Sequence, residues 1–332
     1  MDGKVIVSVS RERVIPFIQK QWFLIGICAS VVLGYVYPEW GRFLRQYDVI
    51  SIGIFLSFLC TGLCLETQSI LRLVDTIRAP IAAAASSLVF YPILAWLLAF
   101  KLLPTEFVIG ICIIGAGPVT LTRGTIMTAI ARGNVPLSIL ICIVTNILAI
   151  FTMPLMLSLL LNAGGSIDLP IMSMFAALVV VVLVPLVAGQ LLRPFCLTVV
   201  RRHEHSFSIF QSCIIILIIF NVVSRSAEHI NLAGSALLGV LLFVVFLYFF
   251  MLLANYLIAR LIRLDTPSLI AFALHTSQKT LAVSYVVWAA HFADDFPMAF
   301  LPAIMCQLVQ MIAGTFVARF FRLRFPPPRT SQ

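Results

Sequence analysis

Residues 113–125 read IIGAGPVTLTRGT, and residues 274–281 read LHTSQKTL. Each stretch interrupts a long apolar run. Gly115, Gly117 and Pro118 break the helical hydrogen-bond ladder in the first stretch, whereas six consecutive polar residues mark the second. Backbone groups that are freed at membrane depth must be buried in protein or line a cavity. Interruptions at corresponding positions of two halves are typical of a transport site near the midplane of a membrane.

The composition of the rest of the chain indicates an integral membrane protein. Of 332 residues, 61% are hydrophobic and 11% are charged, against roughly 45–50% and about 25% in soluble domains. A soluble enzyme, a disordered protein and a secreted disulfide scaffold are therefore excluded. No room remains for a large extramembrane domain, because about 20 residues are needed for each span.

Hydropathy predicts an all-α membrane protein with ten transmembrane helices. The apolar runs cover residues 22–37, 49–65, 79–100, 107–131, 137–161, 169–192, 207–223, 232–259, 268–290 and 298–320. A glycine-containing gap at residues 162–168 divides them into two five-helix repeats, 1–162 and 163–332. Because five is odd, the second repeat enters the membrane with the opposite orientation. This is the inverted-repeat plan of many secondary transporters, with helices 4 and 9 broken.

Basic residues fix the predicted orientation. With ten spans, 16 basic residues lie in the two tails and the loops on their side, and four lie opposite: Arg42, Arg45, Lys101 and Arg225. The positive-inside rule places both termini in the cytoplasm. The net charge of +9 is then explained by anionic lipid rather than by nucleic acid. No cleavable signal peptide is recognised at the start, so a bacterial inner membrane is expected; a eukaryotic internal membrane is the alternative.

The two remaining basic residues, Arg123 and Lys279, both fall in the interrupted stretches. A charge at the bilayer centre costs about 2.5–3.5 kcal/mol on insertion scales. No run has an Asp or Glu near its middle, so the missing negative charge is expected to arrive with an anionic substrate. Snorkelling to the membrane surface and pairing with carbonyl groups are the alternatives.

Neutral polar groups accompany the two cations. His275 is a candidate proton relay, because imidazole titrates near neutral pH, or a hydrogen-bonded packing residue. The substrate-binding candidates are Arg123, Lys279, His275, Thr120, Thr122 and Thr280. Gln307 and Gln310 are expected to face the second interruption. No set of residues with the spacing of a catalytic or metal site is found, so neither an enzyme nor a metal centre is expected.

Two local stretches carry a family resemblance. One runs from RGNVPLS at residues 132–138 to MPL at 153–155, and the other is SQKTLAV at 277–283. The first resembles the passage from span four to span five in the bile acid:sodium symporter family. The second resembles the branch of that family that contains the vertebrate seventh member and its bacterial relatives. The resemblance implies a core of spans 3–5 and 8–10, a panel of spans 1, 2, 6 and 7, and crossing of helices 4 and 9 within the core. It implies transport of an organic anion, usually with sodium.

The chain departs from that family where sodium binds. The residues at the implied sodium-ligand positions are Gly124, Thr125, Ser138, Cys142, Leu274 and Gln278. Thr125, Ser138 and Gln278 keep ligand oxygens, but Leu274 removes the only carboxylate. A hard cation requires several oxygens. The hypothesis is a degraded sodium site, with transport that is sodium-independent or proton-coupled and Lys279 as the switch.

Other functions stay open at this level. A metalloid exporter would need an accessible thiol, for which Cys112 and Cys142 are the candidates. A non-transporting regulatory membrane protein is the third reading. Apart from sodium or a proton as coupling ion, no cofactor is expected; the partners are a small organic anion and the lipid bilayer, and the oligomeric state is undetermined.

Overall fold

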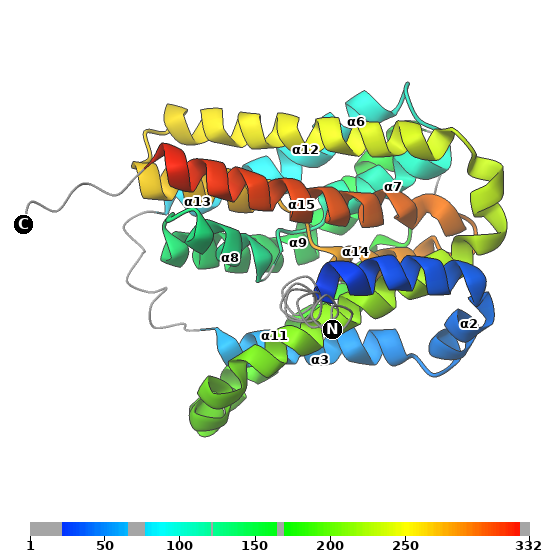
Figure 1. Cartoon of the computed structure of the whole chain (residues 1–332), viewed down its shortest axis with the longest axis horizontal. Helices are drawn as coiled ribbons and strands as arrows, with labels where there is room; N and C mark the ends of the chain where they lie inside the picture. Colours follow the sequence, from blue (N-terminus) through cyan, green and yellow to red (C-terminus); the bar gives the residue numbers. More distant parts are fainter. Residues whose placement is uncertain (1–21, 66–76, 121, 165–168, 326–332) are drawn as a thin grey trace, which may run out of the picture.

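A computed structural model describes residues 22–65, 77–120, 122–164 and 169–325, and its regular elements there are helices (Figure 1). The elements of the first half are a helix at Trp22–Val36, α2 (Pro38–Gln46), α3 (Val49–Cys64), α5 (Arg78–Ala85), the π-helix η2 (Ser86–Phe90), α6 (Tyr91–Ala99), α7 (Thr105–Ala116), α8 (Arg123–Ile130) and α9 (Val135–Gly164).

The elements of the second half are α10 (Ile171–Leu178), the π-helix η3 (Val179–Leu183), α11 (Val184–Ala233), α12 (Ala236–Leu261), α13 (Thr266–Thr276), α14 (Leu281–His291), the 3₁₀ helix η4 (Pro297–Phe300) and α15 (Leu301–Arg324). Proline stands in the first turn of several of these helices, where its missing N–H costs no hydrogen bond.

Within the described residues, six helices are long and apolar enough to cross a membrane by themselves: Arg78–Ala99, Val135–Ala163, Ile171–Val200, His205–Ile230, Ala236–Leu261 and Pro297–Arg324. A seventh span is counted if the first helix and α2, which are bent by 98°, form one. The chain is thus an integral membrane protein by length and composition. The predicted ten spans and the inverted repeats are not established by this count.

The number of full-length spans is lower than the predicted ten because several helices are short. Val49–Cys64, Thr105–Ala116 and Leu281–His291 are apolar but short. With a rise of 1.5 Å per residue, the 12-residue α7 is about 18 Å long, against about 30 Å for the hydrocarbon core. The predicted fourth run is divided into α7 and α8, and the ninth into α13 and α14, so neither run contains one full-length helix.

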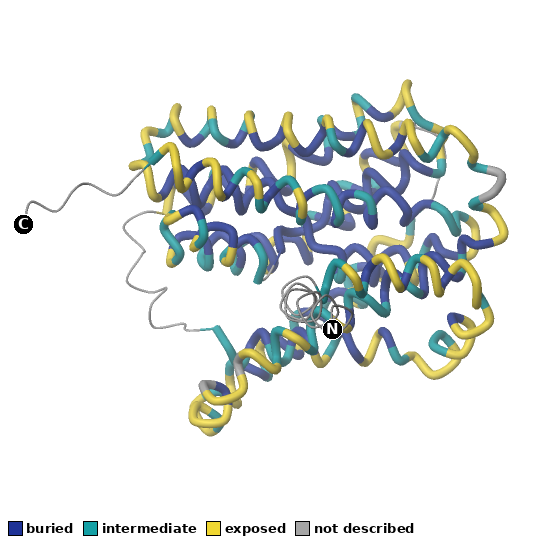
Figure 2. The backbone as a smooth tube through the Cα atoms, in the orientation of Figure 1, coloured by how far each residue is buried: buried dark blue, intermediate teal, exposed yellow. Residues whose placement is uncertain are grey.

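The elements lie in two groups in Figure 1. α3 packs along α11, and α2 packs on the same helix. On the other side, α13 packs against α8, α9 and α12, and α7 packs against α6, α9 and α15. Figure 2 shows buried backbone concentrated in this second group. The predicted division into core and panel, and the repeat boundary at residues 162/163, remain predictions; α9 runs to Gly164, and residues 165–168 lie outside the described part of the chain.

Candidate functional site

The two interrupted stretches meet in the buried interior. α7 ends at Ala116, α13 ends at Thr276, and the extended residues that follow each helix form an antiparallel bridge between Val119 and Lys279. The Thr120 N–H donates to the Gln278 carbonyl at 3.2 Å, and the Thr280 N–H donates to the Pro118 carbonyl at 3.0 Å. Backbone groups released by the two helix ends therefore satisfy each other, as an apolar interior requires.

Lys279 is fully enclosed at this meeting point. Its side chain is 0% exposed. Its Nζ donates to the Ser87 carbonyl at 2.6 Å, the Ser87 hydroxyl at 2.8 Å and the Gly117 carbonyl at 2.9 Å. Nζ also lies 4.4 Å from the centre of the Tyr91 ring. An ammonium has three N–H donors, so the protein satisfies all of them without a carboxylate.

The Ser87 carbonyl can accept from Lys279 because of the π-helix that contains it. In a π-helix each N–H bonds to the carbonyl five residues earlier, and the Tyr91 N–H accordingly donates to the Ser86 carbonyl. The next N–H in this register would belong to residue 92, which is proline and has none. Pro92 therefore leaves the Ser87 carbonyl without an intrahelical partner.

Gln310 holds the backbone of Lys279 from α15. Its Oε1 accepts from the Lys279 N–H at 2.9 Å, and its Nε2 donates to the Lys279 carbonyl at 2.7 Å. The same Nε2 lies 2.8 Å from Gln307 Oε1. The expectation that these two glutamines face the second interruption is confirmed.

His275 fills a second position beside the meeting point. Its Nε2 lies 2.8 Å from the Thr120 carbonyl oxygen, and its Nδ1 lies 2.5 Å from the Ser138 hydroxyl. A carbonyl only accepts, so this geometry assigns the proton to Nε2 and makes Nδ1 the acceptor of the Ser138 hydroxyl. A Cβ at Gly124 would overlap the imidazole ring, so the glycine provides the space for His275.

The three cation-binding candidates do not converge on a carboxylate. Ser138 is bonded to His275, and Thr125 is half-buried on α8. Gln278 is buried, and its Nε2 has no hydrogen-bond partner among the residues that the structure describes. Leu274 packs in an apolar cluster with Met127 and Phe321. Within the described ranges, no group of three or more His, Cys, Asp or Glu residues is placed to hold a metal ion.

Arg123 differs from Lys279 in its surroundings. It is the first residue of α8, and its Cζ lies 3.9 Å from the centre of the Phe23 ring. Its NH1 atom is buried and has no hydrogen-bond partner in the described part of the chain. The preceding Thr122 hydroxyl donates to Gln211 Oε1 on α11 at 3.2 Å. The unpaired guanidinium therefore lies against the first helix, and the residue before it contacts α11.

The remaining substrate candidates are bonded within the protein. The Thr120 hydroxyl accepts from the Gly124 N–H at 3.0 Å, and the Thr280 carbonyl accepts from the Ser284 hydroxyl at 3.1 Å. Sequence reasoning missed Ser87 and Tyr91. Asn146 also lies at this point, since its side chain donates to the Val119 carbonyl at 3.2 Å. For Ser87, the signal in the sequence is a proline five residues further on.

Apolar helices that are interrupted at a shared buried point, with cations beside the breaks, are typical of membrane transporters. The chain belongs to the SBF-like CPA transporter family, whose model matches residues 21–323. The resemblance to bile acid:sodium symporters, and to their seventh-member branch, is thereby confirmed.

Three relatives illustrate the match. The probable sodium/metabolite cotransporter BASS4, chloroplastic, of rice (Oryza sativa subsp. indica) is 26% identical over 97% of this chain and 78% of the rice chain. The uncharacterized sodium-dependent transporter YocS of Bacillus subtilis is 26% identical over 93% of both chains. The sodium/bile acid cotransporter 7-B of Xenopus laevis is 24% identical over 90% of both chains.

Proposed function

We propose that this protein is a secondary active transporter that moves an organic anion by alternating access without using sodium as its coupling ion. The observation that carries the proposal is the pair of cations at the two helix breaks, one of which the protein saturates while the other keeps an unpaired nitrogen. Relatives that are named as sodium cotransporters or sodium-dependent transporters support the transporter class. The residues of this chain support transport that is not coupled to sodium.

Arg123 is the proposed contact for the anionic group of the substrate. A buried guanidinium nitrogen without a partner is costly, and a carboxylate or sulfate accepts two parallel hydrogen bonds from a guanidinium. The N-terminus of α8 adds the positive end of a helix dipole at the same place. Phe23 offers an apolar surface beside the charge, which suits an amphipathic anion.

Lys279 is the proposed internal replacement for a coupling cation. Its ammonium lies among three oxygens of Ser87 and Gly117, which is the kind of ligand set that a hard cation takes. The Ser138 hydroxyl, one of the three oxygens retained at the implied sodium-ligand positions, is already hydrogen-bonded to His275. The Lys279 ammonium therefore takes the place of a bound coupling cation. Loss of a proton from its Nζ during the transport cycle is the proposed route to proton coupling.

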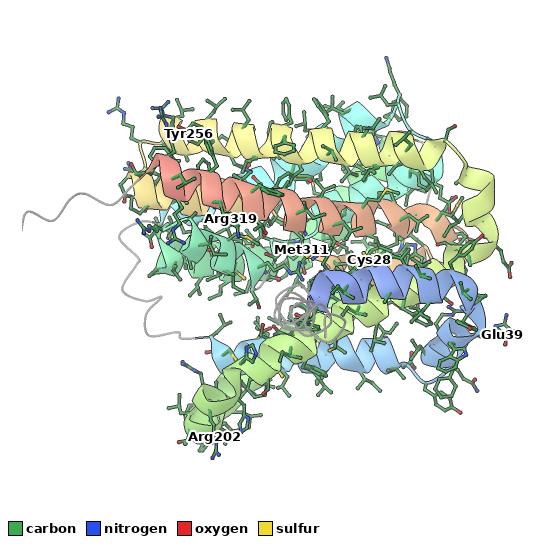
Figure 3. All side chains as sticks on the ribbon, in the orientation of Figure 1. Cys28, Glu39, Arg202, Tyr256, Met311 and Arg319 are labelled. Carbon is green, nitrogen blue, oxygen red and sulfur yellow. The ribbon has the colours of Figure 1, made fainter. Side chains whose placement is uncertain are left out.

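The proposed membrane topology has both termini in the cytoplasm of a bacterial cell. Figure 3 shows Arg202, on the predicted cytoplasmic side, and Glu39 of α2, on the opposite side, at different ends of the molecule. This separation supports the orientation given by the basic residues.

Reconstituted transport tests the proposal. Proteoliposomes would be assayed for uptake of pyruvate, pantoate, a bile acid and a steroid sulfate, in sodium or potassium and at two pH values. We expect one anion class to be transported at equal rates in sodium and potassium, and Arg123→Gln to abolish most of that transport. Uptake that requires sodium, or that is unchanged in Arg123→Gln, would refute the corresponding half of the proposal.

A further inference from the structure

A cavity of about 390 Å³ lies between α2, α3, α11 and α14. Its polar lining includes Arg45, Asp48 and Ser51 from the first half of the chain and Arg225 and Tyr285 from the second. The volume is within the range of small-molecule sites, about 300–1,000 Å³. None of these residues belongs to the site at the two helix breaks.

The charges of the cavity favour an anion. Asp48 is exposed, and Arg225 pairs with Asp294, whose side chain is 97% exposed. The Arg225 guanidinium also lies 5.8 Å from the centre of the Trp288 ring, which neutralises no charge. Water screens such surface carboxylates. The NH1 atom of Arg45 is buried and has no hydrogen-bond partner among the described residues. One guanidinium therefore lacks a partner, and the other is held by a solvent-exposed acid that a ligand can replace.

The floor of the cavity is rigid. The Tyr285 hydroxyl donates to Asn221 Oδ1 at 3.1 Å, and Asn221 Nδ2 donates to the Gly41 carbonyl at 3.1 Å. These bonds join α14, α11 and α2. Tyr285 lies about 6 Å along α14 from Leu281, the first residue after the second helix break, so the cavity and the break share one short helix.

α11 connects this cavity with the surroundings of Arg123. Gln211, which accepts a hydrogen bond from Thr122 next to Arg123 in the chain, and Arg225 are 14 residues apart on α11. That separation is about 21 Å and nearly four full turns, so both residues lie on similar faces of the helix. Two guanidinium sites are thus connected to α11 at positions about 21 Å apart along the helix.

We infer that Arg45 and Arg225 form an anion-binding entrance on the non-cytoplasmic side, which receives the carboxylate or sulfate of an organic anion before it reaches the helix breaks. The role in transport rests on the proposed function; the attraction of an anion to the cavity does not. Arg123, beside the first helix break, is the corresponding contact further along the path.

The attraction can be measured without transport. In a Ser51→Cys variant, the introduced thiol is labelled with a sulfonate-bearing or a quaternary-ammonium-bearing methanethiosulfonate reagent, and labelling of that peptide is read by mass spectrometry so that the eight native cysteines do not interfere. We expect the introduced thiol to react faster with the sulfonate reagent than with the ammonium reagent. This ratio of labelling rates should fall at least about fivefold when Arg45→Gln and Arg225→Gln are added. Adding Arg42→Gln, at an exposed position of the same helix as Arg45, should leave it unchanged. An unchanged preference in the double variant would overturn the inference.

Oriented vesicles test the role in transport. The double variant should raise the KM for a transported anion about tenfold in right-side-out vesicles and less than twofold in inside-out vesicles. Asp294→Asn separates binding from a structural role: if Arg225 binds the anion, this variant leaves the KM unchanged or lowers it. A raised KM in Asp294→Asn, or equal effects in both vesicle types, would overturn the inference. If the wild-type protein transports no anion in either vesicle type while the labelling preference holds, the proposed function fails and the anion site stands.

Discussion

Lys279 and Arg123 are the two cations beside the helix breaks, and the structure treats them differently. Lys279 is 0% exposed and gives each of its three N–H groups to an oxygen. Arg123 packs on Phe23 and keeps a buried nitrogen without a described partner. The comparison teaches that a basic residue at membrane depth is either fully hydrogen-bonded within the protein or has a free donor that a ligand can bind. Counting its partners distinguishes the two cases.

The largest expected effect comes from removing the saturated cation. Lys279→Met would leave three buried oxygen acceptors unpaired, each costing about 1–3 kcal/mol. We expect the variant to lose at least about 3 kcal/mol of stability, measured by thermal unfolding in detergent. Lys101→Met, at an exposed position, is the matched control and should stay within about 0.5 kcal/mol. Equal melting of the two variants would contradict the role of Lys279.

A methyl group beside His275 should have the next largest effect. In Gly124→Ala the new Cβ overlaps the imidazole ring, which Ser138 and Thr120 hold in place. Overpacking of this kind costs about 1–3 kcal/mol. Gly239→Ala on α12 is the control, because no atom lies within 4 Å of its new Cβ, and helix propensity then favours alanine by up to about 1 kcal/mol. Thermal unfolding of both variants checks the opposite signs.

Arg123→Gln should lower anion affinity at least about tenfold, because one charged hydrogen bond contributes about 1.5–3 kcal/mol. The unpaired guanidinium stabilises little by itself, so the melting temperature without ligand should hardly change. Anion-dependent thermal stabilisation measures the affinity. Arg260→Gln, at an exposed arginine 5.6 Å from the Tyr256 ring, is the control. If both variants bind the anion equally well, Arg123 is not its contact.

The smallest effect is expected at a single oxygen around Lys279. Ser87→Ala removes the hydroxyl and keeps the carbonyl, so two of the three acceptors remain. A loss of about 1 kcal/mol is expected. Ser212→Ala, whose hydroxyl bonds only to the Ser208 carbonyl of its own helix among the described residues, should lose less in the same melting assay.

Local patterns predicted the helix breaks, and longer-range packing defined what surrounds them. Glycine and proline next to each other end α7 at Ala116, and the polar run ends α13 at Thr276. The partner of Lys279 is Ser87, 192 residues away, and nothing near Lys279 in the chain specifies it. The same is true of Arg123, because the sequence alone does not show that its neighbour Thr122 bonds to Gln211 on α11. Hydropathy likewise gives apolar runs, but it does not show that three of them contain helices too short to span a bilayer alone.

The most direct test of the central claim is thermal unfolding of the wild-type protein and Lys279→Ala, each in sodium and in potassium. If the Lys279 ammonium replaces a coupling cation, the wild-type protein unfolds at the same temperature in both salts. In Lys279→Ala, sodium should then bind the vacated Ser87 and Gly117 oxygens and raise the unfolding temperature relative to potassium. Stabilisation of the wild-type protein by sodium alone would contradict the account.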